Sequence, residues 1–583
     1  MKRFQKAKNK RREREEKWTE LDAYDRNQQW DLENMPNWLP KPVTNFVHLV
    51  KYTKRAAFSV DNPVAKLRPV SPLNEEAIKK LNKAFEYTWE RIKARKVVRD
   101  NIATAKLLGD AIAFVYWDEK AEGRMGTTVL GDEGYQFEGE IRVKEIDIAN
   151  FYPDPDAFTI EDCRYIHVVE RKPLKWVKKH PKFGKGWKED EVNTNGNPED
   201  RGEIYLRDYT TESEGMVDFH SHYTKEPNGE GGFTYKVTYL VGDKIVYEQP
   251  LTPNRYPFAR LSDFKQRHSF WSMSTCEFIL DNQRIINKVE AIITMIGTLM
   301  QNPQKVIDKN SGIDPAEMAM YGSMPGMTWE SNINPSQSVY YIQPPNIPPV
   351  LFNMLENAKA NIREITGLSE AYLGQSVGSL QTSQGVQSLI ERATLRDRDQ
   401  MYDIELYIED LSKLILDFMV TYYDTPRLIR VAGETPDSYT FEEFVGTQYA
   451  NIDYDMFIDV SSKAPITRMR ESQEAKDLLA MQGQYGGQFG TSLITPQEAI
   501  DKLDLVGKDK IIERMNIEEL RNKTEEAMQV AQMMAEALAQ GINPQEVLQM
   551  GTAMFQQIEE QSKGIGSTKN MNGFQMQQGA PSL

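Results

Sequence analysis

The most extended pattern of apolar residues in the chain runs over residues 382–424. Apolar positions recur there at intervals of three and four residues, and the pattern is clearest over about six turns, which predicts one long amphipathic helix. Two further apolar-faced helices are predicted at residues 272–301 and 347–366, and Thr366-Gly367 ends the second. The charged run ERATLRDRDQ interrupts the longest helix, where we expect a kink or a change of neighbours.

Residues 302–346 form a compact segment between the two shorter helices. Short β-type runs at QKVID, MTWES and SVYYI surround a small predicted helix. Asp314 as N-cap, Pro315 in the first turn and Glu317 mark the start of that helix. The segment is therefore predicted to be a small α/β insert.

The chain before residue 272 alternates between helical and strand patterns. Helices are predicted around residues 73–96 and 98–108. Strands are predicted at AIAFVYWD, GEIRVKEID, CRYIHVVERK, GEIYLRDYT and FTYKVTYLVGDKIVYEQP, the last being a hairpin that turns at Gly242-Asp243. Strands return within residues 425–465, helices dominate residues 466–562, and the polar residues 563–583 are expected to be disordered. The predicted fold class is α+β.

Composition and charge exclude several classes of protein. With 583 residues, 40% apolar and 27% charged, the chain has the composition of a globular protein with several subdomains. The net charge of −15 argues against a protein that wraps nucleic acid tightly. Cys163 and Cys276 give no disulfide framework, which favours a reducing cytoplasm, and no apolar run predicts a signal peptide or a membrane partner.

The first 25 residues are predicted to be a separate basic arm. Residues 1–17 hold nine Lys and Arg against three Glu. One interpretation is a solvated, partly helical arm, and the other is an arm that binds nucleic acid or a scaffold. The residues that would make such contacts are Lys2, Arg3, Lys6, Lys8, Lys10, Arg11 and Arg12.

No catalytic constellation is evident in the sequence, and no catalytic residue, metal ligand or cofactor is predicted. The phosphate-loop, zinc-protease, nucleophile-elbow and Cys-x-x-Cys motifs are all absent. His220 and His222 are interpreted as part of a polar exposed strand, with a metal site as the alternative. The acidic run YPDPDAFTIED is interpreted as a turn, with a cation site, or a nuclease using Asp154, Asp156 and Glu161, as alternatives.

The stretch AYLGQSVGSLQTSQG, between the second apolar helix and the longest one, has an unusual composition. It holds three glycines, four Ser/Thr residues and no charge, and it exceeds the about 2–8 residues that helix connections need. A simple helix–helix linker is one interpretation. A loop that touches a passing molecule without binding it tightly is the other.

The order of these elements resembles the portal protein of tailed double-stranded DNA bacteriophages. Local stretches that are similar include NWLPKPVTNFVHLVKYTKRAAFSVDNP, LLGDAIAFVYWDE, IDIANFYPDPDAFTIEDCRYI and REITGLSEAYLGQSVGSLQTSQGVQSLIERA. The resemblance covers about residues 28–540 and implies the following segments: a wing (26–271), a stem helix (272–301), a clip (302–346), a second stem helix (347–366), a tunnel loop (367–381), a long wing helix (382–424), wing return strands (425–465) and a helical crown (466–562).

The resemblance also implies a function. It predicts a non-enzymatic homo-oligomer, a twelve-membered ring at one capsid vertex, through which double-stranded DNA is packaged and ejected. The implied partners are the major capsid protein, the terminase large subunit and then head-completion and tail adaptor proteins, in the virion and, during assembly, in the host cytoplasm. The loop residues expected to face DNA are Gly374, Gln375, Ser376, Gly378, Ser379, Gln381 and Thr382. Another head–tail adaptor or a scaffold protein is the alternative.

Overall fold

The computed structural model describes most of the chain up to residue 459. The described residues are 1–185, 187, 215–368, 383–432 and 439–459, apart from short gaps at 32–33, 37, 60–63, 122–123, 128–132, 137, 230 and 451. Beyond these, only residues 472, 475–481 and seven isolated positions are described. The predicted strand GEIYLRDYT, the predicted tail 563–583, the glycine-rich loop and most of residues 466–562 therefore lie outside the described residues.

The chain divides into two compact units. The first comprises Met1–Ile429 with Glu442–Val460, and the second comprises Arg430–Phe441 with Ser461–Leu583. In the second unit residues 475–481 are helical, and Ala475 is buried with Leu478 packed against it. The account below concerns the first unit, which holds nearly all of the described residues.

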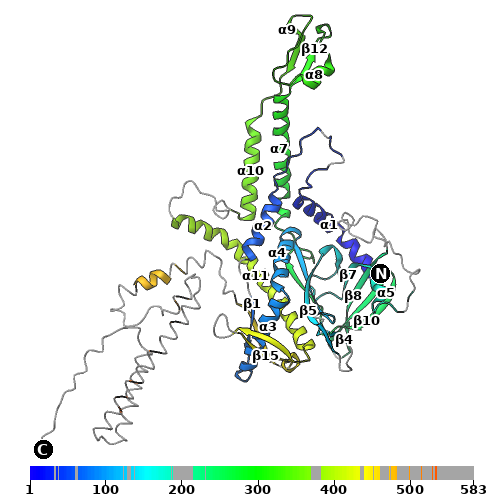
Figure 1. Cartoon of the computed structure of the whole chain (residues 1–583), viewed down its shortest axis with the longest axis vertical. Helices are drawn as coiled ribbons and strands as arrows, with labels where there is room; N and C mark the ends of the chain where they lie inside the picture. The colour runs from blue at the N-terminus through cyan, green and yellow to red at the C-terminus, as the bar shows by residue number, and fades with distance from the viewer. Residues whose placement is uncertain are drawn as a thin grey trace, which may run out of the picture. The chain divides into compact units, whose positions relative to one another are not determined.

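The first unit combines helices with antiparallel sheets, which confirms the predicted α+β class (Figure 1). A five-stranded sheet has the order β10-β9-β8-β7-β6, and a three-stranded sheet has the order β11-β2-β5. The predicted hairpin forms β9 and β10, with Gly242 at positive φ between them. The strands of the two sheets are β2 (Asp110–Asp118), β5 (Glu140–Ile146), β6 (Phe151–Pro153), β7 (Tyr165–Pro173), β8 (Met216–Pro227), β9 (Phe233–Val241), β10 (Lys244–Pro250) and β11 (Phe258–Ser262).

Strand pairs account for the remaining β structure. Strand β1 pairs with β16, so two segments that are far apart in the chain meet in one ladder. The other pairs are β3 with β4, β12 with β13 and β14 with β15. Their bounds are β1 (Val64–Pro69), β3 (Arg124–Thr127), β4 (Glu133–Gln136), β12 (Gln304–Ile307), β13 (Val339–Ile342), β14 (Arg427–Ala432), β15 (Tyr439–Phe444) and β16 (Tyr454–Asp459).

The helices predicted before residue 272 and the longest predicted helix are present, whereas α2 and α5 were not predicted. The two patterns near residue 96 become α3 and α4, separated at Lys93, whose φ of 55° lies in the left-handed region. The longest pattern becomes α11, a helix of 40 residues. The bounds are α1 (Lys2–Asp25), α2 (Phe46–Ser59), α3 (Glu75–Arg91), α4 (Ala94–Leu108), α5 (Leu174–Lys179), α7 (Leu280–Gln301), α8 (Pro315–Tyr321), α9 (Pro335–Ser338), α10 (Pro349–Thr366) and α11 (Ser383–Tyr422).

Two apolar cores connect helix α1 to the sheets and to the long helices. One core lies on the sheets and contains Trp18, Ile112, Phe151 and Phe258. The other joins α1 and α2 to the bases of α7 and α10 through side chains that include Leu21, Val47, Ile286 and Ile362. Helix α1 contributes to both, through Trp18 to the first and Leu21 to the second, so it is an integral part of the fold.

Helices α7 and α10 lie side by side and form a stalk, and β12, α8, α9 and β13 form a head at its far end (Figure 1). The buried side chains of α7 all lie between Leu280 and Ala291, and those of α10 lie between Ala358 and Thr366. The buried half of each helix is therefore the half nearest the sheets. The outer half and the head are covered by little else in the described part of the chain.

Two predictions in this region are wrong in detail. Helix α7 was predicted to begin at residue 272, but it begins at Leu280 after one 3-10 turn, because the preceding residues bond to acidic side chains of the body. The run MTWES is not a strand, and β12 pairs with β13 alone. The small helix is confirmed, since Asp314 caps α8 by accepting a hydrogen bond from the backbone N–H of Ala316 at 2.9 Å.

Candidate functional site

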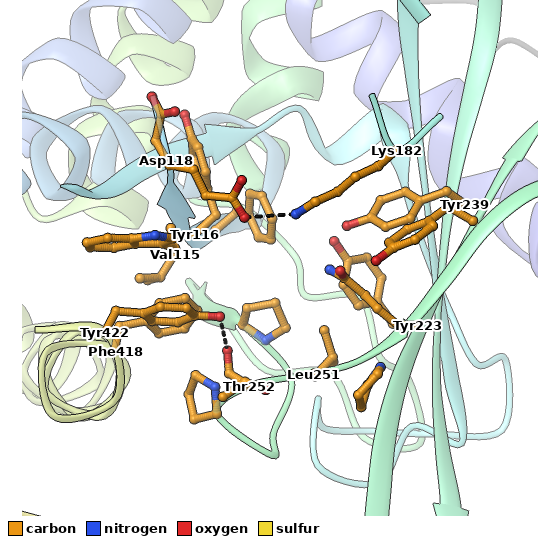
Figure 2. Close-up of a pocket in the computed structure, with 18 of the residues that line it drawn as sticks. Val115, Tyr116, Asp118, Lys182, Tyr223, Tyr239, Leu251, Thr252, Phe418 and Tyr422 are labelled. Carbon is orange, nitrogen blue, oxygen red and sulfur yellow. Dashed lines mark hydrogen bonds and ion pairs between the residues drawn. The ribbon is translucent and has the colours of Figure 1, made fainter. Parts of the chain in front are cut away.

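A cavity of about 540 Å³ is lined largely by aromatic side chains. Figure 2 shows Tyr223 and Tyr239 of the five-stranded sheet across this cavity from Tyr422 of α11. Trp117 stacks on Tyr422 with ring centroids 5.0 Å apart, and the Tyr422 hydroxyl donates to the carbonyl of Thr252 at 2.8 Å. Burial raises the pKa of Tyr239 to about 12, so its phenol is a poor proton carrier near neutral pH. The contacts fix the end of α11 against the sheets.

The acidic turn forms ion pairs with basic side chains. Asp154 is buried and accepts two hydrogen bonds from Arg164, at 2.5 and 2.9 Å. Asp156 pairs with Arg164 at 2.7 Å and with Lys6 at 3.0 Å. Burial acts to raise the pKa of Asp154, but the hydrogen bonds from Arg164 and the backbone outweigh it and lower that pKa. The cationic partners thus occupy the oxygens that the alternative nuclease site would need.

The interpretation of His220 and His222 as an exposed polar strand is wrong. A third histidine, His167 of β7, lies beside both of them, with ring nitrogens 3.0 Å from His220 and 3.2 Å from His222. His167 and His220 are buried, and Phe4 of α1 packs on both rings. His167 meets its neighbours through two different nitrogens, and the described residues contain no cluster that would hold a metal ion.

The stalk exposes apolar side chains on its outer half. Both helices have an apolar face, but only their inner halves bury it in the chain. Exposed apolar surface on this scale marks an interaction surface rather than a solvated one. The exposed apolar residues of the outer half are Ile292, Met300, Val350, Phe352 and Met354, and Ile285 and Ile365 are exposed nearer the sheets.

The head has almost no core of its own. Met318 is the one buried apolar side chain among residues 302–346, all of which are described. Met320 is 74% exposed and Tyr340 is 69% exposed. So small a core gives a segment little independent stability, so the head depends on what it packs against. The other exposed apolar residues of the head are Val306, Tyr321, Met324, Met327, Tyr341 and Ile342.

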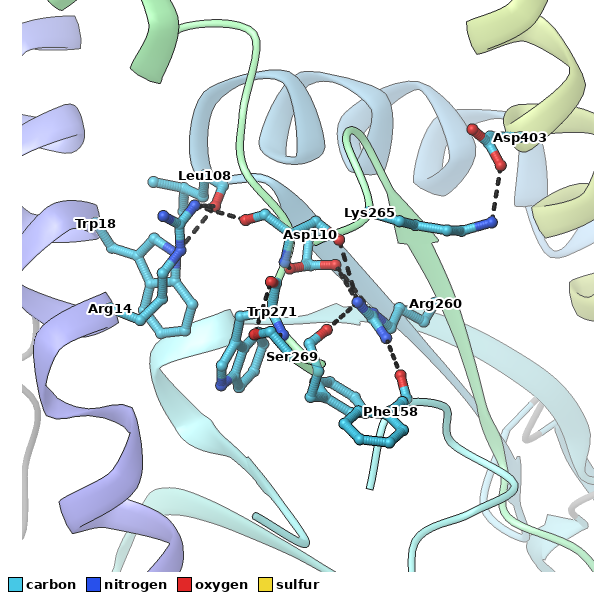
Figure 3. Close-up of polar contacts among 12 residues, drawn as sticks. Arg14, Trp18, Leu108, Asp110, Phe158, Arg260, Lys265, Ser269, Trp271 and Asp403 are labelled. Carbon is cyan, nitrogen blue, oxygen red and sulfur yellow. Dashed lines mark hydrogen bonds and ion pairs between the residues drawn. The ribbon is translucent and has the colours of Figure 1, made fainter. Parts of the chain in front are cut away.

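Buried charges fix the base of the stalk to the sheets. Asp110, at the start of β2, accepts from the backbone N–H of Ser272 at 2.7 Å and from Arg260 at 2.8 Å, as Figure 3 shows for Asp110 and Arg260. Asp263 accepts from Lys106 of α4 and from both the N–H and the hydroxyl of Thr275, each at 2.6 Å. Breaking one partner of such a buried pair is strongly destabilising. The chain before α7 is thereby held in one orientation.

Helix α1 joins the same network. Arg14 donates to the carbonyl of Ser272 at 2.6 Å and pairs with Glu277 at 2.7 Å, and Figure 3 shows Arg14 and Trp18 directed at Leu108. Gly109 lies beneath this junction with φ of +97°, and a Cβ there would stand 2.3 Å from the Ser272 carbonyl oxygen. No local pattern in the sequence indicated this network, because its members come from four segments of the chain.

The predicted N-terminal arm is corrected by the structure. Residues 1–25 form α1, and Phe4, Ala7, Trp18 and Leu21 are buried in the body. Arg11 is also buried and donates to the carbonyls of residues 148, 149 and 151, so it is removed from the contact residues. Of the other predicted residues, Lys8 is half-buried, Lys6 pairs with Asp156, and the exposed ones are Lys2, Arg3, Lys10 and Arg12.

The predicted DNA-facing residues Gly374, Gln375, Ser376, Gly378, Ser379, Gln381 and Thr382 lie outside the described residues. Their flanks are described: α10 ends at Thr366, where Gly367 takes the left-handed conformation, and α11 begins at Ser383. The predicted helix ends on both sides are thus confirmed to within one or two residues. The role of the loop stays a prediction.

The geometry of the first unit defines an α+β fold whose prominent free surfaces, within the described residues, are the stalk and the head. A family model described as Phage P22-like portal protein matches residues 1–565, and the chain belongs to that family. It is a portal protein, a component of the bacteriophage virion that acts in genome packaging. The resemblance stated from the sequence is confirmed, and it extends over the N-terminal residues that were expected to fall outside it. No curated protein matches the chain.

None of the helices in the described part of the chain has the length and apolarity that a bilayer crossing requires.

Proposed function

We propose that the chain assembles through its stalk and head into a closed ring, most simply of twelve subunits, at one vertex of the capsid. The observation that carries the proposal is the apolar outer half of the stalk together with a head that lacks its own core. Repeating one head-to-tail contact between neighbouring stalks closes a ring and buries these faces. In this arrangement α7 and α10 are the stem, the head is the clip and the sheets form the wing.

The glycine-rich loop is proposed to line the channel of this ring. It connects the C-terminal end of α10 to α11, and its predicted contact residues are uncharged. Gly374 and Gly378 give the backbone conformational freedom, and Gln375 and Ser379 offer weak hydrogen bonds to phosphate oxygens. Uncharged contacts of this kind allow a duplex to slide, whereas lysines would hold it.

The net charge of −15 supports a sliding channel. Twelve copies carry a total of about −180, and negative walls repel the phosphates of DNA at every position. Duplex DNA would therefore pass through during packaging and ejection without being bound tightly.

The partners follow from this placement. The clip would contact the terminase large subunit during packaging and head-completion or tail adaptor proteins afterwards. The outer part of the ring would contact the major capsid protein, with assembly taking place in the host cytoplasm. The chain has a structural role in this proposal, without catalysis or cofactor, and the helical residues 466–562 would form the crown.

Two variants test the roles of ring and loop separately. Deletion of residues 375–380 should leave the ring intact and impair packaging or retention of the genome. Deletion of residues 575–580, which has the same length, is the control and should package normally. Loss of the ring in the first variant would mean that the loop is a packing element, and normal packaging would mean that it does not contact DNA.

A further inference from the structure

A second cavity, of about 860 Å³, lies where α3 turns into α4. Residues of α2, α3, α4 and α11 line it, and its apolar side includes Phe58 and Trp89. Four cationic residues line the same cavity within two helical turns: Lys93, Arg95, Lys96 and Arg99. This concentration of positive charge contrasts with the net charge of −15 for the chain.

These four residues are exposed, and none of their side chains makes an ion pair or hydrogen bond with another described residue. Two acidic residues, Glu90 and Asp100, also line the cavity but pair with none of the four. Elsewhere in the described chain exposed basic side chains do pair with nearby acids, as Lys79 does with Glu75 at 2.7 Å. The cavity therefore presents an unsatisfied positive field.

The cations lie at the N-terminal end of α4, where the helix dipole is unfavourable for positive charge. Lys93 is the N-cap of α4, Arg95 and Lys96 lie in its first turn, and that turn holds no acidic residue. The N-terminus of a helix carries partial positive charge and favours anions. The N-cap side chain makes no capping hydrogen bond, so the helix end and the cations repel each other until an anion binds between them.

A buried donor supplies an independent observation. Trp89 is 4% exposed and borders the cavity, and its indole N–H has no acceptor among the described residues. A buried N–H of this kind is costly unless an acceptor is supplied from outside the chain. An anionic oxygen in the cavity would accept a hydrogen bond from the Trp89 N–H and would also balance the charge of the unpaired cations.

We propose that this cavity binds the phosphate groups of duplex DNA, as an attractive contact separate from the repulsive channel. Arg95 and Arg99 lie four residues apart on one face of α4, which places two guanidinium groups in reach of successive phosphates. Lys96 adds a third charge to that face. The ligand is a run of phosphodiesters and not one small anion, because the cations extend over two turns.

The test compares two charge-matched variants of the full chain. Arg95→Gln, Lys96→Gln and Arg99→Gln are combined in one, and Lys175→Gln, Lys179→Gln and Lys185→Gln, three exposed lysines, are combined in the other. Binding of a labelled DNA duplex is measured by fluorescence anisotropy over a range of NaCl concentrations. Mass and symmetry of each variant are measured in parallel, so that failure of ring assembly is seen separately.

The first variant should bind the duplex at least about tenfold more weakly at moderate salt, and the slope of log K against log salt should fall by about 3, since three phosphate contacts are lost. The control should match the unmodified chain. Trp89→Phe, which keeps the ring and removes the N–H, should weaken binding without changing the slope.

Four results would overturn the proposal. Equal loss in both triple variants would mean that only net charge matters. Loss of the ring in the first variant would assign the cations to a contact between subunits, with acids of a neighbouring copy as partners. Inorganic phosphate that binds by calorimetry, together with unchanged duplex binding in the first variant, would assign a small-anion site. An unmodified chain that forms the ring but does not bind the duplex would also overturn the proposed site, and it would leave the proposed ring and channel intact.

Discussion

Acidification below about pH 6.5 should loosen α1 from the five-stranded sheet, because His167 and His222 are held neutral beneath it. Burial, with the charges of His220, His222 and the N-terminal amino group, places the pKa of His167 well below its ordinary value. Burial, Arg3 and the N-terminal amino group lower the pKa of His222 to about 4. Arg3 and the N-terminal amino group lie at the start of α1, so protonation of the histidines places like charges next to that helix.

The size of the effect follows from the His222 pKa. A fall from 6.5 in the unfolded chain to about 4 in the folded chain corresponds to about 3 kcal/mol. The unfolded chain binds the extra proton first, so stability is unaffected above pH 6.5, declines as the pH falls from 6.5, and levels off near pH 4. His167 contributes with the same sign.

Hydrogen exchange of the peptides that cover α1 and β8 measures this loss directly, after correction for intrinsic exchange rates. Protection should be high at pH 7 and reduced by pH 4.5, and His222→Gln should remove part of the pH dependence. His268→Gln, at an exposed position, is the control and should behave as the unmodified chain. Equal protection at both pH values, or an unchanged pH dependence in His222→Gln, would refute the reasoning.

Three further substitutions test the packing and the stalk. Asp263→Ala leaves the buried ammonium of Lys106 without its carboxylate and should lower the free energy of unfolding by about 3 kcal/mol; a loss below about 1 kcal/mol in denaturant titration would contradict the network. Gly109→Ala forces a left-handed φ and a backbone clash at 2.3 Å, and should cost at least about 2 kcal/mol, whereas an unchanged melting temperature would contradict it. Tyr340→Ser should change subunit stability by only about 0.5 kcal/mol but weaken ring assembly in sedimentation velocity; an unaffected ring would remove Tyr340 from the interface.

The long helices were predictable because their signals are local. The three- and four-residue spacing set α10 and α11 to within two residues, and Asp314 with Pro315 fixed the start of α8. Gly367 ended α10 as expected, since it takes a φ of 72° that other residues avoid.

The errors come from partners that are distant in sequence. The segment before α7 was predicted as helix. Asp110 and Asp263, which lie in other elements, instead accept hydrogen bonds from its backbone and hold it in a non-helical conformation. The three histidines come together from β7 and β8, separated by 53 residues at the closer pair. A local pattern contains neither contact.

The sequence of α1 contains a helical pattern of buried positions, but its many charged residues made the pattern hard to recognise. Phe4, Ala7, Arg11 and Trp18 recur at helical spacing on one face, and all four are buried. The seven predicted contact residues drew attention to charge instead, and a buried arginine at the centre of the face broke the apolar stripe. The apolar faces of the stalk helices could also be predicted from the sequence, because their spacing is local, and their packing on neighbouring subunits stays a prediction.

The mass and symmetry of the purified protein test the central claim most directly, by light scattering and by cryo-EM class averages. A ring of twelve chains of 67.1 kDa, about 805 kDa in total with a central channel and the stalks packed against one another, is the expected result. A closed dimer with two-fold symmetry that buries the stalk and head would contradict the account.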